Sequence, residues 1–253
     1  MIERVRVSRY VTPLREGGSL PGLVEADDLG FYVCKFSGAG QGVRVLVAEV
    51  LVGELARRLG IRTPRLVGLD LCAEIARYEA DEEVQDLLTA SVGLNLGVDF
   101  LPGAFGVDGE LATPGEVAGR ILWLDAFTAN VDRSWRNPNL LVWHGDLWAI
   151  DHGASLYFHH GWTRAITDPE RFAAQPWDVS DHVLRGFLAE VPAADEHARS
   201  VLSGEVFAEV ASLVPDEWLH FVPDLEPDQV RTAYVEFLTA RLGARGWLPG
   251  ESS

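Results

Sequence analysis

The pattern of apolar and polar positions divides the chain into a β-rich beginning and a helical remainder. Apolar residues alternate with polar ones over residues 5–14, 20–25 and 31–36, which is typical of strands. The segments between them, residues 15–19 and 27–30, contain glycine, serine and aspartate, as turns do. We therefore expect a three-stranded antiparallel meander with a glycine-containing first turn.

The apolar period then changes to that of a helix. After residues 37–42, one helical face is predicted to hold Leu46, Val47, Val50, Leu51, Leu55 and Leu59. Gly60 is expected to end this helix. Two more strands are predicted at residues 64–71 and 91–101, and the acidic stretch 74–86 is predicted to be a helix or a solvated connection.

The second half of the chain is predicted to be mostly helical around one short hairpin. A helix is expected over residues 114–130, with Trp123, Leu124 and Phe127 in the core. Two strands, residues 140–144 and 147–150, are predicted to meet at a two-residue turn of Gly145 and Asp146. Amphipathic helices with proline-containing connections follow from about residue 165.

Composition narrows the class of protein. A chain of 253 residues that is 47% hydrophobic can bury a large core, and its formal net charge of −17 argues against nonspecific nucleic-acid binding. No apolar stretch is long enough to span a membrane, and the first residues are charged where a signal peptide would be apolar, so we expect a cytoplasmic protein with no membrane partner. Cys34 and Cys72 lie in apolar runs and are predicted to be buried thiols.

Lys35 is the only lysine, because 20 of the 21 Lys and Arg residues are arginine. An ammonium is a compact point charge that fits against a phosphate where a guanidinium fork would not. The alternative is a lysine at the end of a strand that simply reaches water. The residues that follow it in the chain favour the first interpretation.

An ordered set of residues has the spacing that phosphoryl transfer needs. Glu49 follows Lys35 by fourteen positions, Asn137 follows Asp132 by five, and Asp151 comes fourteen positions later. In such a site an aspartate accepts the proton of the attacking hydroxyl, while asparagine and aspartate oxygens hold magnesium on the nucleotide phosphates. Each residue alone is compatible with a cap, a turn or a solvated carboxylate. Their joint order favours a phosphotransferase.

A small antiparallel sheet with one helix, followed by a mostly helical half, is the plan of protein-kinase-like phosphotransferases. We therefore predict an α+β, two-lobed protein-kinase-like fold. The N-lobe is expected over residues 1–101 and carries the nucleotide-binding sheet and helix. The C-lobe is expected over residues 102–253 and carries the catalytic loop, the metal-binding strand and a helical tail.

The motifs themselves resemble those of the HipA-like kinases, which are bacterial relatives of the eukaryotic protein and phosphoinositide kinases. The matching segments are residues 32–36, 48–49, 55–61, 130–133 with Asn137, and 150–153. The resemblance covers roughly residues 8–160 and implies ATP and Mg²⁺ as cofactors. It implies the following roles: Lys35 on the phosphates, Glu49 as its partner, Asp132 as catalytic base, Asn137 and Asp151 as metal ligands, and Gly17, Gly18 and Ser19 as the phosphate-covering loop, whose serine is regulatory in some members.

The chain also departs from the HipA pattern. Ser134 stands where HipA toxin kinases commonly have a histidine, and the Asp132-Arg133 pair is similar to the lipid-kinase form. Asn139 is an alternative metal ligand if the loop bulges at Pro138. The acceptor is expected to be a hydroxyl of a protein serine or of a small molecule.

Two other functions are compatible with parts of the sequence. A nucleotide-binding pseudokinase would keep the fold and lose phosphate transfer. A metal-dependent hydrolase would use the cluster His144, Asp146, Asp151, His152, His159 and His160. The tryptophans Trp177, Trp218 and Trp247 are expected in the core, with a wall of an acceptor groove as the alternative.

Overall fold

The computed structural model describes residues 1–14, 20–77, 79–107, 113–163 and 165–250. By contacts the chain forms two compact units, residues 1–47 with 64–102, and residues 48–63 with 103–253. The helix predicted after residue 42 begins in the first unit and continues into the second. A division into lobes at residues 101 and 102 stays a prediction.

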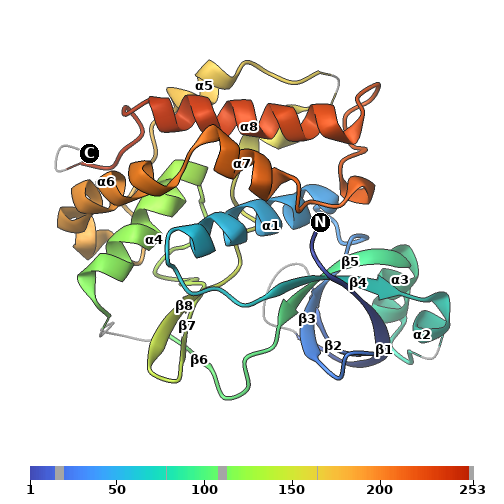
Figure 1. The fold of residues 1–253 in the computed structure, drawn as a ribbon. Coiled ribbons are helices and arrows are strands. Elements are labelled where there is room, and N and C mark those ends of the chain that lie inside the picture. Colours follow the sequence, from blue (N-terminus) through green and yellow to red (C-terminus); the bar gives the residue numbers. More distant parts are fainter. Residues whose placement is uncertain (15–19, 78, 108–112, 164, 251–253) are drawn as a thin grey trace. The chain divides into compact units, whose positions relative to one another are not determined.

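The first unit is a closed barrel of five strands (Figure 1). Its strands are β1 (Arg4–Pro13), β2 (Gly22–Ala26), β3 (Phe31–Lys35), β4 (Leu66–Leu71) and β5 (Gly93–Asp99). The predicted antiparallel pairing of β1 with β2 and of β2 with β3 is confirmed. The sheet is not antiparallel throughout, because β1 also pairs in parallel with β4 and thereby closes the barrel in the order β1-β2-β3-β5-β4.

The barrel interior holds alternate residues of the strands, as the period of two requires. Val7, Val24, Cys34, Val67 and Leu69 are at most 2% exposed. The acidic stretch after β4, predicted to be a helix or a solvated connection, forms two short helices, α2 (Ala73–Arg77) and α3 (Glu82–Ala90).

α1 (Val43–Arg58) is buried on almost every side from Leu46 to Ala56, and all six predicted face residues are in the core. A helix that is apolar around its whole circumference is typical of a protein interior. Two carboxylates interrupt this run: Glu54 is partly exposed, whereas Glu49 is only 2% exposed.

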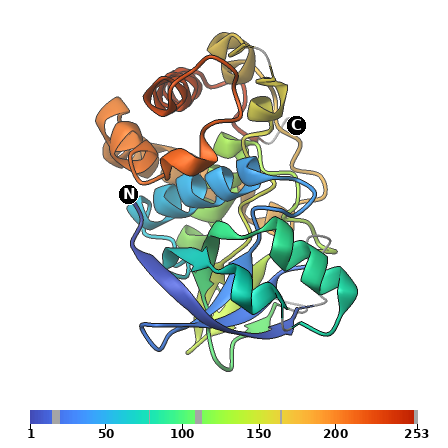
Figure 2. The same cartoon turned by 90° about the vertical axis from the view of Figure 1, so that its right-hand side faces the viewer.

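The second unit combines a small sheet with helices. Its elements are β6 (Phe105–Gly106), α4 (Gly115–Thr128), β7 (Leu140–Trp143), β8 (Asp146–Ala149), α5 (Pro169–Ala173), α6 (Val191–Val201), α7 (Gly204–Ala211) and α8 (Pro227–Gly243), with 3-10 turns at Tyr157–Gly161, Arg185–Glu190 and Asp216–Trp218. α5 and α7 both pack against α8, which Figure 2 views nearly along its axis.

Aromatic side chains fill the core of this unit. Trp123 and Phe127 of α4 stack with ring centroids 4.9 Å apart, and Trp247 packs edge-on against Trp123 at 5.4 Å. Trp218 and Trp247 are each 1% exposed, so the prediction that they are core residues is confirmed. In the described part of the chain no helix is both long and apolar enough to cross a membrane.

Candidate functional site

The site is built on the loop that follows α4. Ala129 ends this helix in the left-handed region, with φ of 53°, and the N–H of Asn130 donates to the carbonyl of Asp125 at 2.8 Å. The side-chain oxygen of Asn130 then accepts from the N–H of Asp132 at 2.9 Å. The helix end therefore passes directly into the predicted catalytic loop with its backbone groups satisfied.

Two side-chain amides hold the carboxylate of Asp132. The Nδ2 atoms of Asn137 and Asn139 donate to the same oxygen, Oδ2, at 2.9 Å and 3.2 Å. The side chain is partly exposed, so it is oriented by these bonds and still reachable. The predicted pair of Asp132 and Asn137 does come together, and Asn139 joins it.

A buried carboxylate that belongs to none of the sequence motifs lies beneath this loop. Asp125 of α4 is fully buried. It accepts hydrogen bonds from Asn130 Nδ2 at 2.9 Å, Arg133 Nε at 2.6 Å and His182 Nε2 at 3.0 Å. A lone aspartate in an apolar helical run was the available signal, since such a residue is rarely buried unless it is paired.

Burial alone raises the pKa of Asp125, but the Arg133 guanidinium and the hydrogen bond from His182 outweigh burial and hold the pKa well below its ordinary value. Arg133 and Asp125 form an ion pair with both side chains completely shielded from solvent. The carboxylate is therefore ionised and anchors both ends of the stretch 130–133 to α4.

Arg133 also ties the loop to the hairpin. Its NH1 group donates to the carbonyls of Asn139 and Ile150, the latter at 3.2 Å, and its NH2 group lies 3.3 Å from Nδ1 of His152. One guanidinium thus connects the catalytic loop with the residues on either side of Asp151.

The β7–β8 hairpin places Asn139 and Asp151 at the same end of the sheet. Leu140 pairs with Ala149, and the N–H of Ile150 donates to the carbonyl of Asn139 at 3.0 Å. Asn139 and Asp151 both have positive φ, 48° and 55°, so the chain turns sharply at each of them. The predicted turn was wrong by one residue: His144 and Gly145 occupy it, both with positive φ, as a type I′ turn requires.

Glu49 contacts the segment that follows Asp151. Its Oε1 atom accepts from the N–H of Gly153 at 2.8 Å. Lys35 is the last residue of β3 and lies opposite Leu96 of β5 in the first unit. The pairing of Lys35 with Glu49 therefore stays a prediction, and the predicted loop of Gly17, Gly18 and Ser19 lies outside the described residues.

A family model described as HipA-like kinase matches residues 7–242. The chain belongs to the HipA-like kinase family. This match confirms the resemblance seen in the motifs and extends it well beyond residue 160, into the helical tail. No curated protein matches the chain.

A solved structure confirms the kinase fold of this HipA-like kinase. A Helicobacter pylori proinflammatory kinase, CtkA, is similar with a TM-score of 0.58 and 10% identity, over 92% of this chain and 95% of that one. A Golgi casein kinase with Mn and ADP bound has a TM-score of 0.46 and 13% identity, over 95% of this chain and 72% of that one. The second likeness is too low to support an argument. The predicted two-lobed protein-kinase-like fold is thus shown.

The histidines do not form the cluster that a hydrolytic metal site requires. His152 lies beside Arg133, and His159 hydrogen-bonds Tyr234 through Nδ1 at 2.8 Å, whereas His144 belongs to the hairpin turn. Among the described residues no group of three or more His, Cys, Asp or Glu side chains is placed to hold a metal ion. The positions of these histidines therefore do not support the alternative function of a metal-dependent hydrolase.

Proposed function

We propose that this HipA-like kinase transfers the γ-phosphate of ATP to a hydroxyl group of an acceptor. Family membership supports a phosphotransferase, and the loop geometry supports an active one. The observation that carries the proposal is the Asp132 carboxylate, which two amides hold through one oxygen in a loop anchored on Asp125.

Asp132 is the residue we assign as general base. Because Asn137 and Asn139 both contact Oδ2, we assign Oδ1 to the acceptor hydroxyl, whose proton it would accept. A carboxylate fixed in this way keeps its orientation while the acceptor enters, which lowers the entropic cost of reaching the reactive geometry.

The side chains at the end of the hairpin fit a magnesium ion. Mg²⁺ prefers hard oxygen ligands and is usually held by one or two carboxylates together with nucleotide phosphates, not by an all-protein cage. Asp151 supplies carboxylate oxygens, and the amide oxygens of Asn137 or Asn139 would complete the protein ligands. Asn139 fits better than Asn137 beside Asp151. The backbone carbonyl of Asn139 accepts from the N–H of Ile150, which is the residue before Asp151. When bound, the ion neutralises charge on the phosphates.

The remaining roles follow from the family resemblance. Lys35 is proposed to bind the phosphates and Glu49 to hold Lys35, with Gly17, Gly18 and Ser19 covering the nucleotide. The bond from Gly153 to Glu49 supports part of this assignment, since it links the glutamate to the segment that carries Asp151. This bond holds the residues that follow Asp151 against α1.

The test is phosphate transfer by the purified chain. With labelled ATP, Mg²⁺ and a cell extract as the source of acceptors, we expect Asp132→Asn to reduce labelling by roughly 100- to 10,000-fold, the usual contribution of a general base. Asp86→Asn, an exposed carboxylate on α3, is the matched control and should label as the wild type does.

Two outcomes would contradict the proposal. Equal labelling by Asp132→Asn and the wild type would show that Asp132 is not the general base. ATP-dependent thermal stabilisation without any transfer would favour the nucleotide-binding pseudokinase.

A further inference from the structure

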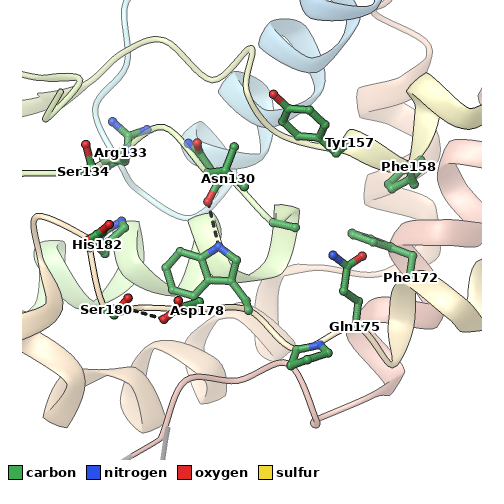
Figure 3. A pocket seen from close by; sticks show the side chains of 15 residues that line it. Asn130, Arg133, Ser134, Tyr157, Phe158, Phe172, Gln175, Asp178, Ser180 and His182 are labelled. Atoms are coloured by element: carbon green, nitrogen blue, oxygen red, sulfur yellow. Dashed lines mark hydrogen bonds between the residues drawn. The ribbon is translucent and has the colours of Figure 1, made fainter. Parts of the chain in front are cut away.

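A cavity of about 480 Å³ lies beside the catalytic loop, entirely within the second unit (Figure 3). Its volume is in the range of pockets that bind small molecules. Val131 and Arg133 both line it, so Asp132 stands between two lining residues, about 3.8 Å from each along the Cα trace. The cavity therefore adjoins the loop that carries the proposed general base, although Asp132 itself does not line it.

The opposite wall comes from the segment after Asp151. Tyr157, Phe158 and Phe172 present aromatic side chains around the cavity, as Figure 3 shows. Trp177 lines it as well. Trp177 was expected in the core, with a groove wall as the alternative; it is partly exposed and lines the cavity, whereas Trp218 and Trp247 are buried in the core. Its indole Nε1 donates to the carbonyl of Asn130 at 2.8 Å.

This wall is held in place by bonds on both sides. Arg241 of α8 is fully buried and donates to the carbonyls of Phe172, at 2.7 Å, and Gln175, and also to that of Ala126 at the end of α4, at 2.8 Å. On the other side the N–H of Trp135 donates to the carbonyl of Asp181 at 3.2 Å. A wall fixed in this way forms a pocket before the ligand arrives, which favours binding.

The charges around the cavity favour a cation. Of its lining residues only Arg133 and His182 can be positive, and both are bonded to the buried Asp125 carboxylate, whose single negative charge offsets that of Arg133. Asp178 and Asp181 line the cavity and are exposed. Hydrogen bonds from the backbone and side chain of Ser180 lower the pKa of Asp178, so it stays ionised.

We propose that this cavity binds the acceptor and that the acceptor is a small hydroxyl compound that carries an amine. Carboxylates attract an ammonium group, and aromatic faces such as those of Tyr157 and Trp177 bind cations as well. This inference rests on the proposed phosphotransferase activity. A basic serine-containing protein is the rival occupant, and a pocket of this size favours the small molecule.

The transfer step balances with the groups named. The acceptor oxygen forms a bond to the γ-phosphorus of ATP, and the bond from that phosphorus to the β,γ-bridging oxygen breaks. The hydroxyl proton passes to Asp132 and then to solvent, and ADP leaves. The amine itself takes no part in the step and serves only to bind and orient the acceptor against Asp178 and Asp181.

The experiment compares acceptors that differ only in charge. ADP formation above the acceptor-free rate is measured with glucosamine and ethanolamine, with glucose and ethylene glycol as their neutral counterparts. We expect at least one amine to have a KM about tenfold below that of its neutral counterpart. Asp178→Asn and Asp181→Asn should each raise that KM about fivefold with little change in kcat.

The variants are conservative, because asparagine at 178 keeps an oxygen for the N–H of Ser180. Glu196→Gln, an exposed carboxylate on α6 that does not line the cavity, is the matched control and should leave the KM unchanged. Calorimetric titration of glucosamine and ethanolamine into the wild type and both variants measures binding without turnover.

The outcomes separate this inference from the proposed function. If Asp132→Asn abolishes acceptor-free ATP hydrolysis but neither amine is preferred or binds, the phosphotransferase stands and the cationic acceptor is refuted. The same holds if a protein serine is labelled equally in the wild type, Asp178→Asn and Asp181→Asn. If ATP is not turned over at all, the calorimetric titration alone decides. Amine binding that is weaker in Asp178→Asn than in the wild type supports the cavity as a cation site. Absence of amine binding overturns the inference.

Discussion

Replacing Asp125 with asparagine tests whether the buried ion pair positions the catalytic loop. The substitution keeps the shape of the side chain but removes the charge that offsets Arg133, and both side chains are fully shielded from solvent. Removing one partner of a buried pair costs about 3–5 kcal/mol, because the other charge is left uncompensated. Since asparagine retains one acceptor oxygen, we expect the lower end, about 3 kcal/mol.

Thermal unfolding and nucleotide turnover are the two assays. For a chain of this size 1 kcal/mol corresponds to a Tm shift of roughly 2–4 °C, so Asp125→Asn should lower the Tm by about 6–12 °C. Well below that temperature kcat should fall roughly 100-fold, because a displacement of about 1 Å at the catalytic base has this effect. Both values are compared with those of Asp195→Asn.

Asp195 is the matched control because it is also a buried carboxylate, 5% exposed on α6, bonded to Trp123 and Arg199 and not to the catalytic loop. Asp195→Asn should lower the Tm and leave kcat close to that of the wild type. The positioning role is refuted if both variants lose kcat equally, or if Asp125→Asn keeps wild-type kcat.

Acid unfolding gives a second measure of the same pair. The folded pKa of Asp125 is depressed, so its stabilising contribution is present above the unfolded pKa of about 3.9 and is lost as the pH falls below that value toward the folded pKa. Below about pH 4 the free energy of unfolding of the wild type should fall more steeply than that of Asp125→Asn. Parallel pH profiles of denaturant unfolding would contradict this expectation.

Three further predictions concern the other site residues and the thiols. Lys35→Arg, which keeps the charge, should lower kcat/KM for ATP at least about tenfold because the guanidinium is too broad for the phosphate site, and wild-type kinetics would refute this role. Asn139→Ala should raise the Mg²⁺ concentration needed for half-maximal turnover more than Asn137→Ala does, and the reverse order would identify Asn137 as the ligand. In the folded chain iodoacetamide should modify the partly exposed Cys72 and spare Cys34, whose thiol pKa is raised by burial, while mass spectrometry after unfolding should find both modified.

Much of the fold could be predicted because it depends on neighbours in sequence. The alternation of residues 31–36 and the helical period after residue 42 each describe one element, and β3 and α1 lie where these patterns predicted them. The spacing of Asp132 and Asn137 likewise predicted a contact inside one short loop, and their side chains are bonded at 2.9 Å. Residues only a few positions apart can contact each other in few ways, because the short backbone between them limits their relative positions.

Other features could not be predicted because they join residues far apart in the chain. The parallel pairing of β1 with β4 turns a predicted meander into a barrel, and no local period encodes which distant strand an edge will meet. Cys72, expected to be buried, is partly exposed because it follows the end of β4 outside the barrel interior.

The same division applies to the site. By itself the sequence determined the order of chemical groups, a lone lysine, a helix glutamate and an aspartate-asparagine loop, because phosphoryl transfer restricts residue types and short spacings. Only the tertiary structure decided that Asp125 lies under that loop and is bonded to His182, which comes 57 positions later in the chain. The same is true of Trp177, which forms a wall of the neighbouring cavity. A buried charge is stable only where its partners converge on it, and that convergence is a property of the folded chain.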